Sequence, residues 1–91
     1  MVEIRHLKLI DAINRLGSMK KAAIELHLTQ SALSHQLKQL EGYVGSSIFY
    51  RNHNELTFTQ FGEEFCKLSK EVLAKIDHLE DQVEEHRHRI F

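Results

Sequence analysis

The chain has 91 residues, of which 42% are hydrophobic and 27% are charged, a composition typical of one small globular domain. No run reaches the roughly 18 consecutive apolar residues that a membrane span requires, and the N-terminus lacks the pattern of a signal peptide. The single cysteine excludes an internal disulfide, so we expect a reduced, cytoplasmic setting.

The formal net charge of −1 hides an uneven distribution. Residues 1–60 carry seven Lys or Arg against five Asp or Glu, whereas residues 61–91 carry five against eight. Only the first part of the chain is therefore suited to face a phosphate backbone.

Two short helices are predicted at the start of the chain. The first is marked by apolar residues three apart, namely Ile4, Leu7, Ile10, Ile13 and Leu16. It is expected to end at Gly17. Ser18 is the expected N-cap of a second helix, which buries Ala22, Ala23 and Leu26. A short turn at residues 27–28 follows.

A third helix is predicted between Thr29, its expected N-cap, and Gly45. Its sequence carries two separate faces. The apolar face consists of Leu33, Leu37, Leu40 and Val44, and the opposite face of Ser31, Ser34, His35 and Lys38. A merely solvated face usually carries many Glu and Lys. This polar and almost uncharged face indicates a surface that is approached closely, and the base edges of a DNA major groove are the leading candidate.

Two strands and a long helix are predicted after Gly45. The segments Ile48–Arg51 and Glu55–Phe58 flank an Asn-His-Asn turn and form a hairpin. From Thr59, the expected N-cap, one helix without proline continues to the end of the chain. At ~1.5 Å per residue this helix is about 45 Å long.

These elements predict a mainly α fold, a winged helix-turn-helix with a small two-stranded wing (residues 1–58) and a long C-terminal dimerisation helix (residues 59–91). A 91-residue monomer cannot cover the apolar stripe of that helix, so a partner helix is expected, most simply from a second copy. The expected homodimer contact consists of Phe65, Leu68, Val72, Ile76, Leu79 and Val83.

The run AAIELHLTQSALSHQLKQLEGYVGSSIFYRNHNELTFTQFG resembles the DNA-binding domain of LysR-type transcriptional regulators. The anchor positions are Ala22, Ala23, Thr29, Gln30, Ser34, Leu40, Glu41, Gly45, Phe49, Arg51, Thr59 and Gly62. The resemblance implies sequence-specific binding of double-stranded DNA for transcription regulation. A homodimer would bind an interrupted palindrome, with the helix that starts near Gln30 in the major groove. The long helix corresponds to a linker helix that pairs antiparallel in dimers.

The resemblance also assigns contacts to individual residues. Base and phosphate contacts at the start of the third helix fall on Thr29, Gln30, Ser31, Ala32, Ser34 and His35, with Lys38 further along. Gln30 suits an adenine edge, whereas Lys38, Lys20 and Lys21 are expected at phosphates. In the wing, Arg51 corresponds to a residue near the minor groove or the backbone, where it would bind a phosphate or, alternatively, pair with Glu41, and His53 is a further candidate DNA contact. His35 stands where many relatives have arginine, which argues against bidentate reading of guanine.

Ligands and further partners are implied only by the resemblance. Family members carry a larger C-terminal domain that binds a small-molecule co-inducer. That effector domain is absent from this sequence, so no cofactor is expected in this chain. Tetramers in the presence of an effector domain, RNA polymerase as a further partner, no membrane contact, and a cytoplasmic, nucleoid-associated location are also implied.

Functions of other classes are less well supported. An enzyme is not expected, because Ser34 and His35 are helix neighbours whose side chains diverge by about 100° and cannot form a nucleophile–base pair. No metal is expected either, because His86 and His88 point away from each other. The alternative function is a protein–protein adaptor that oligomerises through the long helix, although the polar face lacks a large apolar anchor. An RNA-binding winged helix is the third candidate, although exposed stacking aromatics are missing.

Overall fold

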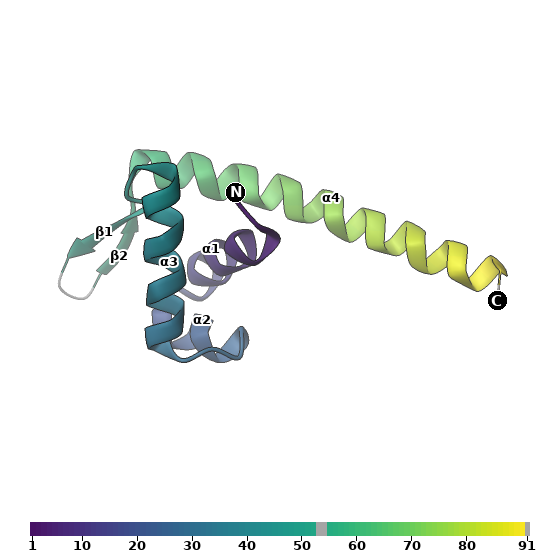
Figure 1. Ribbon diagram of the computed structural model, residues 1–91, viewed down its shortest axis with the longest axis horizontal. Coiled ribbons are helices and arrows are strands. Elements are labelled where there is room, and N and C mark those ends of the chain that lie inside the picture. The colour runs from purple at the N-terminus through teal and green to yellow at the C-terminus, as the bar shows by residue number, and fades with distance from the viewer. Residues whose placement is uncertain (53–54, 91) are drawn as a thin grey trace.

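The computed structural model describes residues 1–52 and 55–90, with the backbone alone at residues 51, 52 and 55. In chain order, the elements are α1 (Ile4–Leu16), α2 (Met19–Glu25), α3 (Gln30–Val44), β1 (Phe49–Asn52), β2 (Glu55–Phe58) and α4 (Gln60–Ile90). Figure 1 shows α1, α2, α3 and the hairpin gathered in one body, from which α4 extends. This arrangement confirms the predicted winged helix-turn-helix with a long C-terminal helix. The domain division after residue 58 stays a prediction.

Short polar side chains begin α2 and α3 at the predicted positions. The Ser18 hydroxyl oxygen accepts the Lys21 N–H at 3.1 Å, and Thr29 Oγ1 accepts the Ala32 N–H at 3.0 Å. Each bond satisfies an N–H group that the helix itself leaves without a partner. Gly45 ends α3 in the left-handed region, with φ of 77°. The local capping signals therefore placed these helix ends correctly.

The turn between α2 and α3 contains a left-handed residue that is not glycine. His27 has φ of 57°. In this left-handed region, residues with a Cβ have a higher conformational energy than glycine. The Leu28 N–H donates to the Ala23 carbonyl at 2.8 Å, which is the long bond of a Schellman turn. The predicted turn is thus present, at some cost in backbone strain.

The hydrophobic core lies between α1, α2, α3 and the first turns of α4. The apolar face predicted for α3 is confirmed, because its three central leucines are buried and Val44 is half-buried. The stripe predicted for α1 is partly wrong. Ile4 is 47% exposed, whereas Leu9, outside the stripe, is 1% exposed. The helix α1 packs against α2, α3 and α4. Residues on several of its sides are therefore buried, and a single stripe does not account for all of them.

The wing is an antiparallel pair in which Phe49 lies opposite Phe58, and their rings stack at 4.6 Å. The predicted first strand began at Ile48, one residue too early. The Ile48 N–H donates to Glu41 Oε2 at 2.7 Å, and the Ile48 carbonyl accepts the Thr59 N–H at 2.9 Å. The bond to Thr59 continues the register of the pair, whereas the Ile48 N–H bonds to α3, so the regular strand begins only at Phe49.

The helix α4 has two parts that differ in burial. Gly62, Cys66 and Ser69 are buried on the side that packs against α1. Every residue from 77 to 90 is exposed, and Figure 1 shows this part leading away from the body. The longest dimension of the molecule is 53 Å. Over the described ranges, no helix is both long and apolar enough to cross a membrane.

Candidate nucleic-acid interface

The candidate interface is the outward face of α3. Ser31, His35 and Lys38 are exposed, and their spacing of four and three residues places them on one line along the helix. The opposite side of α3 is buried in the core through Leu33 and Leu37. In Figure 1, α3 runs along the near side of the body between the α2 turn and the wing. The predicted separation of an exposed polar face from a packing face is therefore present.

The start of α3 brings most of its predicted contact residues together. Gln30 occupies the first helical position and is exposed, whereas Ala32 and Ser34 are half-buried at the flanks of the face. Thr29 is exposed, and its hydroxyl oxygen caps the helix by accepting the Ala32 N–H. The hydroxyl proton of Thr29 is still available to an external acceptor.

Cationic groups border this face. Lys20 and Lys21 are exposed in the first turn of α2, which packs against α3. Within the part of the chain that the structure describes, neither they nor Lys38 form an ion pair with an acidic side chain. Arg15, in contrast, donates to Glu25 at 3.0 Å and to an aspartate of α1, and these hydrogen bonds raise its pKa. The three lysines are thus exposed cations without an acidic partner among the described residues, and their phosphate contacts stay predictions.

The structure describes less of the wing than of α3. Arg51 lies in β1 opposite Leu56, and its side chain is outside the described residues. His53 lies outside them altogether. The predicted contacts of Arg51 and His53 therefore stay predictions.

The exposed line on α3 extends further than the residues predicted from the sequence. Gly42 is exposed four residues after Lys38, and Gln39 is exposed beside that line. Gly42 could have been predicted from the sequence, because a residue four positions after Lys38 lies on the same side of a helix. The outward face of α3 therefore spans nearly the whole helix.

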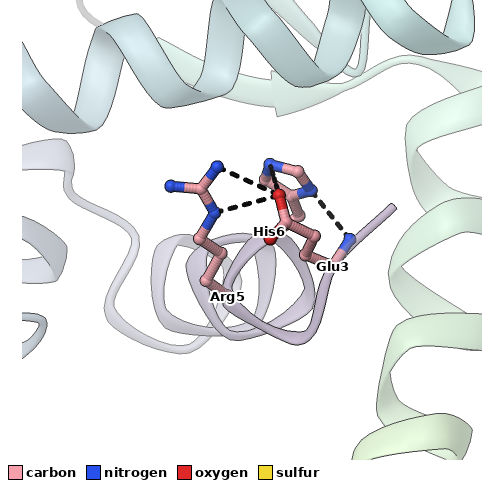
Figure 2. Close-up of polar contacts among 3 residues, drawn as sticks. All are labelled: Glu3, Arg5 and His6. Atoms are coloured by element: carbon pink, nitrogen blue, oxygen red, sulfur yellow. Dashed lines mark hydrogen bonds and ion pairs between the residues drawn. The ribbon is translucent and has the colours of Figure 1, made fainter. Parts of the chain in front are cut away.

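A second polar cluster lies at the beginning of α1 (Figure 2). Glu3 Oε2 accepts from Arg5 Nη2 at 3.0 Å, and the Glu3 N–H donates to His6 Nδ1 at 3.0 Å. His6 is only 6% exposed. Burial lowers its pKa, the neighbouring Arg5 acts in the same direction, and Glu3 opposes them. The cluster fixes the start of α1 and lies apart from the exposed line on α3.

The predicted dimerisation residues differ in exposure. Four of them are exposed by 43–61%, namely Leu68, Val72, Leu79 and Val83. Ile76 and Phe65 are half-buried, and Phe65 packs against the core. The centre of the Phe65 ring lies 5.9 Å from the centre of the Phe61 ring. The helix therefore presents an apolar stripe that this chain leaves largely uncovered.

The end of α4 contains local ion pairs, one of which involves a histidine. His88 Nε2 lies 3.0 Å from Glu84 Oε1, and Arg89 Nη2 lies 2.9 Å from Glu85 Oε1. Across residues 1–52 and 55–90, no three His, Cys, Asp or Glu side chains gather in a way that could hold a metal ion.

The chain is similar to known regulatory proteins. Residues 4–63 match the family described as bacterial regulatory helix-turn-helix protein, lysR family. The HTH-type transcriptional regulator MetR of Buchnera aphidicola is 49% identical over 76 residues, which cover 84% of this chain and 24% of that protein. The chain thus spans about a quarter of the length of the curated relatives it matches.

Two solved structures share the fold over almost the whole chain. A complex of BenM_DBD with benA site 1 DNA has a TM-score of 0.87 and 27% identity, covering 92% of this chain and 94% of that chain. A CbnR_DBD–DNA complex has a TM-score of 0.83 and 27% identity, covering 93% and 98%. Both similar chains are thus DNA-bound domains of nearly the same extent as this chain.

Proposed function

We propose, since the chain belongs to the lysR family of bacterial regulatory helix-turn-helix proteins, that it binds specific sequences of double-stranded DNA and thereby regulates transcription. The observation that carries the proposal is the exposed line of Ser31, His35 and Lys38 on a helix whose opposite side is core. Its side chains are short or hydrogen-bonding, which suits base edges in the major groove. The DNA-bound state of the two similar domains supports the same assignment.

The proposed contacts divide into two classes. Gln30, Ser31, Ser34 and His35 read base edges, and Gln30 is suited to the N6 and N7 edge of adenine. Lys38 contacts phosphates, together with Lys20 and Lys21 of α2. Phosphate contacts position the protein without reading sequence, so only the first class should determine specificity.

The division can be tested on a duplex that the wild-type protein selects from random sequences. Gln30→Ala should relax preference at one base pair and cost about 1–3 kcal/mol there, whereas Lys38→Ala should weaken all duplexes alike and reduce the salt slope by about one. Fluorescence anisotropy across a salt series measures both effects, and Glu63→Ala on α4 is the control. If no duplex is selected, the proposal is wrong and the protein–protein adaptor becomes the better interpretation.

We also propose that the protein acts as an antiparallel homodimer through α4. Six large hydrophobic side chains are exposed on the described part of this helix: Phe61, Leu68, Val72, Leu79, Val83 and Ile90. Along the chain they form three pairs: Phe61 with Ile90, Leu68 with Val83, and Val72 with Leu79. The two members of each pair lie the same number of residues before and after a point between Lys75 and Ile76. A stripe with this symmetry matches itself when two copies run in opposite directions about a two-fold axis at that point.

The register predicts which residues meet. In this arrangement Val72 of one copy lies level with Leu79 of the other, whereas in a parallel pair each residue meets its own copy. Val72→Cys and Leu79→Cys chains, each also carrying Cys66→Ser, should therefore cross-link efficiently only when they are mixed. Ala74→Cys, exposed on the opposite side of α4, is the matched control and should not cross-link. Preferred Val72→Cys self-pairing would contradict the antiparallel register.

The curated relatives extend well beyond the matched region. For the longer proteins of which such a domain forms part, we propose co-inducer binding in a further C-terminal domain, tetramer formation and contact with RNA polymerase. These roles rest on resemblance to the family and not on residues of this chain. Their test is a pull-down of RNA polymerase by a full-length relative, with and without this domain.

A further inference from the structure

One residue connects the reading helix, the wing and the dimerisation helix. The Ile48 N–H donates to Glu41 Oε2 of α3 at 2.7 Å. The Ile48 carbonyl accepts the N–H of Thr59, the residue before α4, at 2.9 Å. Ile48 itself directly precedes β1, and its side chain is 0% exposed. Both polar groups of this peptide segment are thus used to join separate elements.

Thr59 completes the connection on the side of α4. Its hydroxyl oxygen accepts the Gly62 N–H at 2.9 Å and so caps the helix. The same hydroxyl lies 2.7 Å from the Ser47 carbonyl oxygen and 3.2 Å from that of Ile48, and it donates there. One side chain therefore fixes the first turn of α4 to the segment that enters the wing.

Gly62 brings α4 into direct contact with that segment. A Cβ built on Gly62 would lie 2.0 Å from the Ile48 carbonyl oxygen and 3.0 Å from the Phe58 ring. No real side chain tolerates such a distance to backbone, so glycine is needed for this close approach. The start of α4 is consequently held by steric contact as well as by hydrogen bonds.

We propose that this junction, formed by Glu41, Ile48, Thr59 and Gly62, sets the angle between α3 and α4 and thereby the half-site spacing that the dimer accepts. The inference rests on the proposed function, in which α3 reads DNA and α4 pairs with a second copy. Thr59 then acts as a positioning residue for DNA binding without touching DNA.

The geometry makes the spacing sensitive to small changes at the junction. The proposed two-fold axis lies about 15 residues along α4, or about 23 Å from its start. A tilt of about 10° at the junction moves that point by about 4 Å over such a lever, which is close to the rise of about 3.4 Å per base pair in DNA. Holding half-sites at one spacing therefore requires a rigid connection at Ile48.

The test compares Thr59→Val, which keeps the shape and removes the hydroxyl, with Thr59→Ser, which keeps the hydroxyl. The probes are a duplex selected by the wild-type protein, its isolated half-site, and versions of the full site whose spacing differs by single base pairs over about one helical turn. Anisotropy gives the affinities, sedimentation the dimer, and circular dichroism the folded state.

We expect wild type and Thr59→Ser to share one sharply preferred spacing. Thr59→Val should bind the half-site as wild type does and remain dimeric, but its preference for the best spacing should fall by about tenfold, because a loose linkage no longer enforces one geometry. A merely structural role would lower half-site and full-site binding together and leave the preference unchanged.

An unchanged spacing preference in folded Thr59→Val overturns the junction proposal and leaves DNA binding intact. If Thr59→Val does not fold, Glu41→Gln replaces it, because this variant weakens the bond between α3 and Ile48. The same spacing preference is then measured, and an unchanged preference again overturns the proposal. A wild-type protein that selects no duplex overturns the proposed function itself, a different and recognisable result.

Discussion

The helix-turn-helix body and the outer part of α4 are stabilised in different ways. In the body, Leu33, Leu37 and Leu40 are at most 2% exposed, and α1 contacts three other helices. From residue 77 to 90 every side chain is exposed, and the contacts found there join residues three or four apart. Such exposed pairs contribute only about 0.3–0.5 kcal/mol each. The body can therefore be stable in one chain, whereas the outer helix gains little stability from contacts with its own body.

The largest effect should come from removing a core side chain. Leu37→Ala should lower the free energy of unfolding by about 2–5 kcal/mol, because it leaves a cavity in a closely packed interior. Leu79→Ala, the matched change on the exposed stripe, should leave the body unaffected at concentrations below dimer formation. Urea unfolding followed by circular dichroism measures both variants. Equal losses in the two would show that the regions are not independent.

Acidic residues on the stripe should separate the two copies. Val72→Glu combined with Leu79→Glu should raise the dimer dissociation constant by at least about a hundredfold, because each carboxylate would be buried without a partner. The outer turns of α4 should also lose helicity, while the body stays folded. Sedimentation equilibrium and far-ultraviolet circular dichroism measure these changes, with Ala74→Glu on the opposite side as control. An unmodified chain that is monomeric at high concentration would contradict this interpretation of the stripe.

A smaller effect, confined to the body, is expected at the turn between α2 and α3. His27 has φ of 57°, a region that glycine adopts with less strain, so His27→Gly should raise the free energy of unfolding by up to about 1 kcal/mol. The helicity of the outer part of α4 should not change. Thermal unfolding measures the gain. A loss of stability would mean that the imidazole makes a contact worth more than the strain.

The smallest effect concerns pH. Burial, aided by Arg5, lowers the pKa of His6, so the unfolded chain binds a proton more readily than the folded one. Stability from this group is complete above the unfolded value of about 6.5 and is lost as pH falls from there toward the lower folded pKa. His6→Gln keeps an acceptor for the Glu3 N–H and should flatten this decline. Melting temperatures measured between about pH 7.5 and about pH 5 test it, and identical slopes would contradict it.

Much of the exposed face of α3 was predictable from local sequence. Ser18 and Thr29 begin helices where their side chains can cap them, and the period of 3.6 residues separated Leu33 and Leu37 from Ser31 and His35. Caps and periodicity act within one or two turns, so they are visible without the rest of the fold. The role of Arg51 and His53 stays a prediction from the family.

The sequence alone determined the order of the elements, the start of α2, both ends of α3, and the two faces of α3, whereas α2 ends at Glu25, before the predicted Leu26. Only the tertiary structure decided that Leu9 is buried while Ile4 is exposed, that β1 begins after Ile48, and that the first turns of α4 belong to the core. Each of these outcomes depends on an element distant in the chain: α4 against α1, and Glu41 and Thr59 against Ile48. Local patterns specify which residues can be buried, and packing between distant segments determines which ones are.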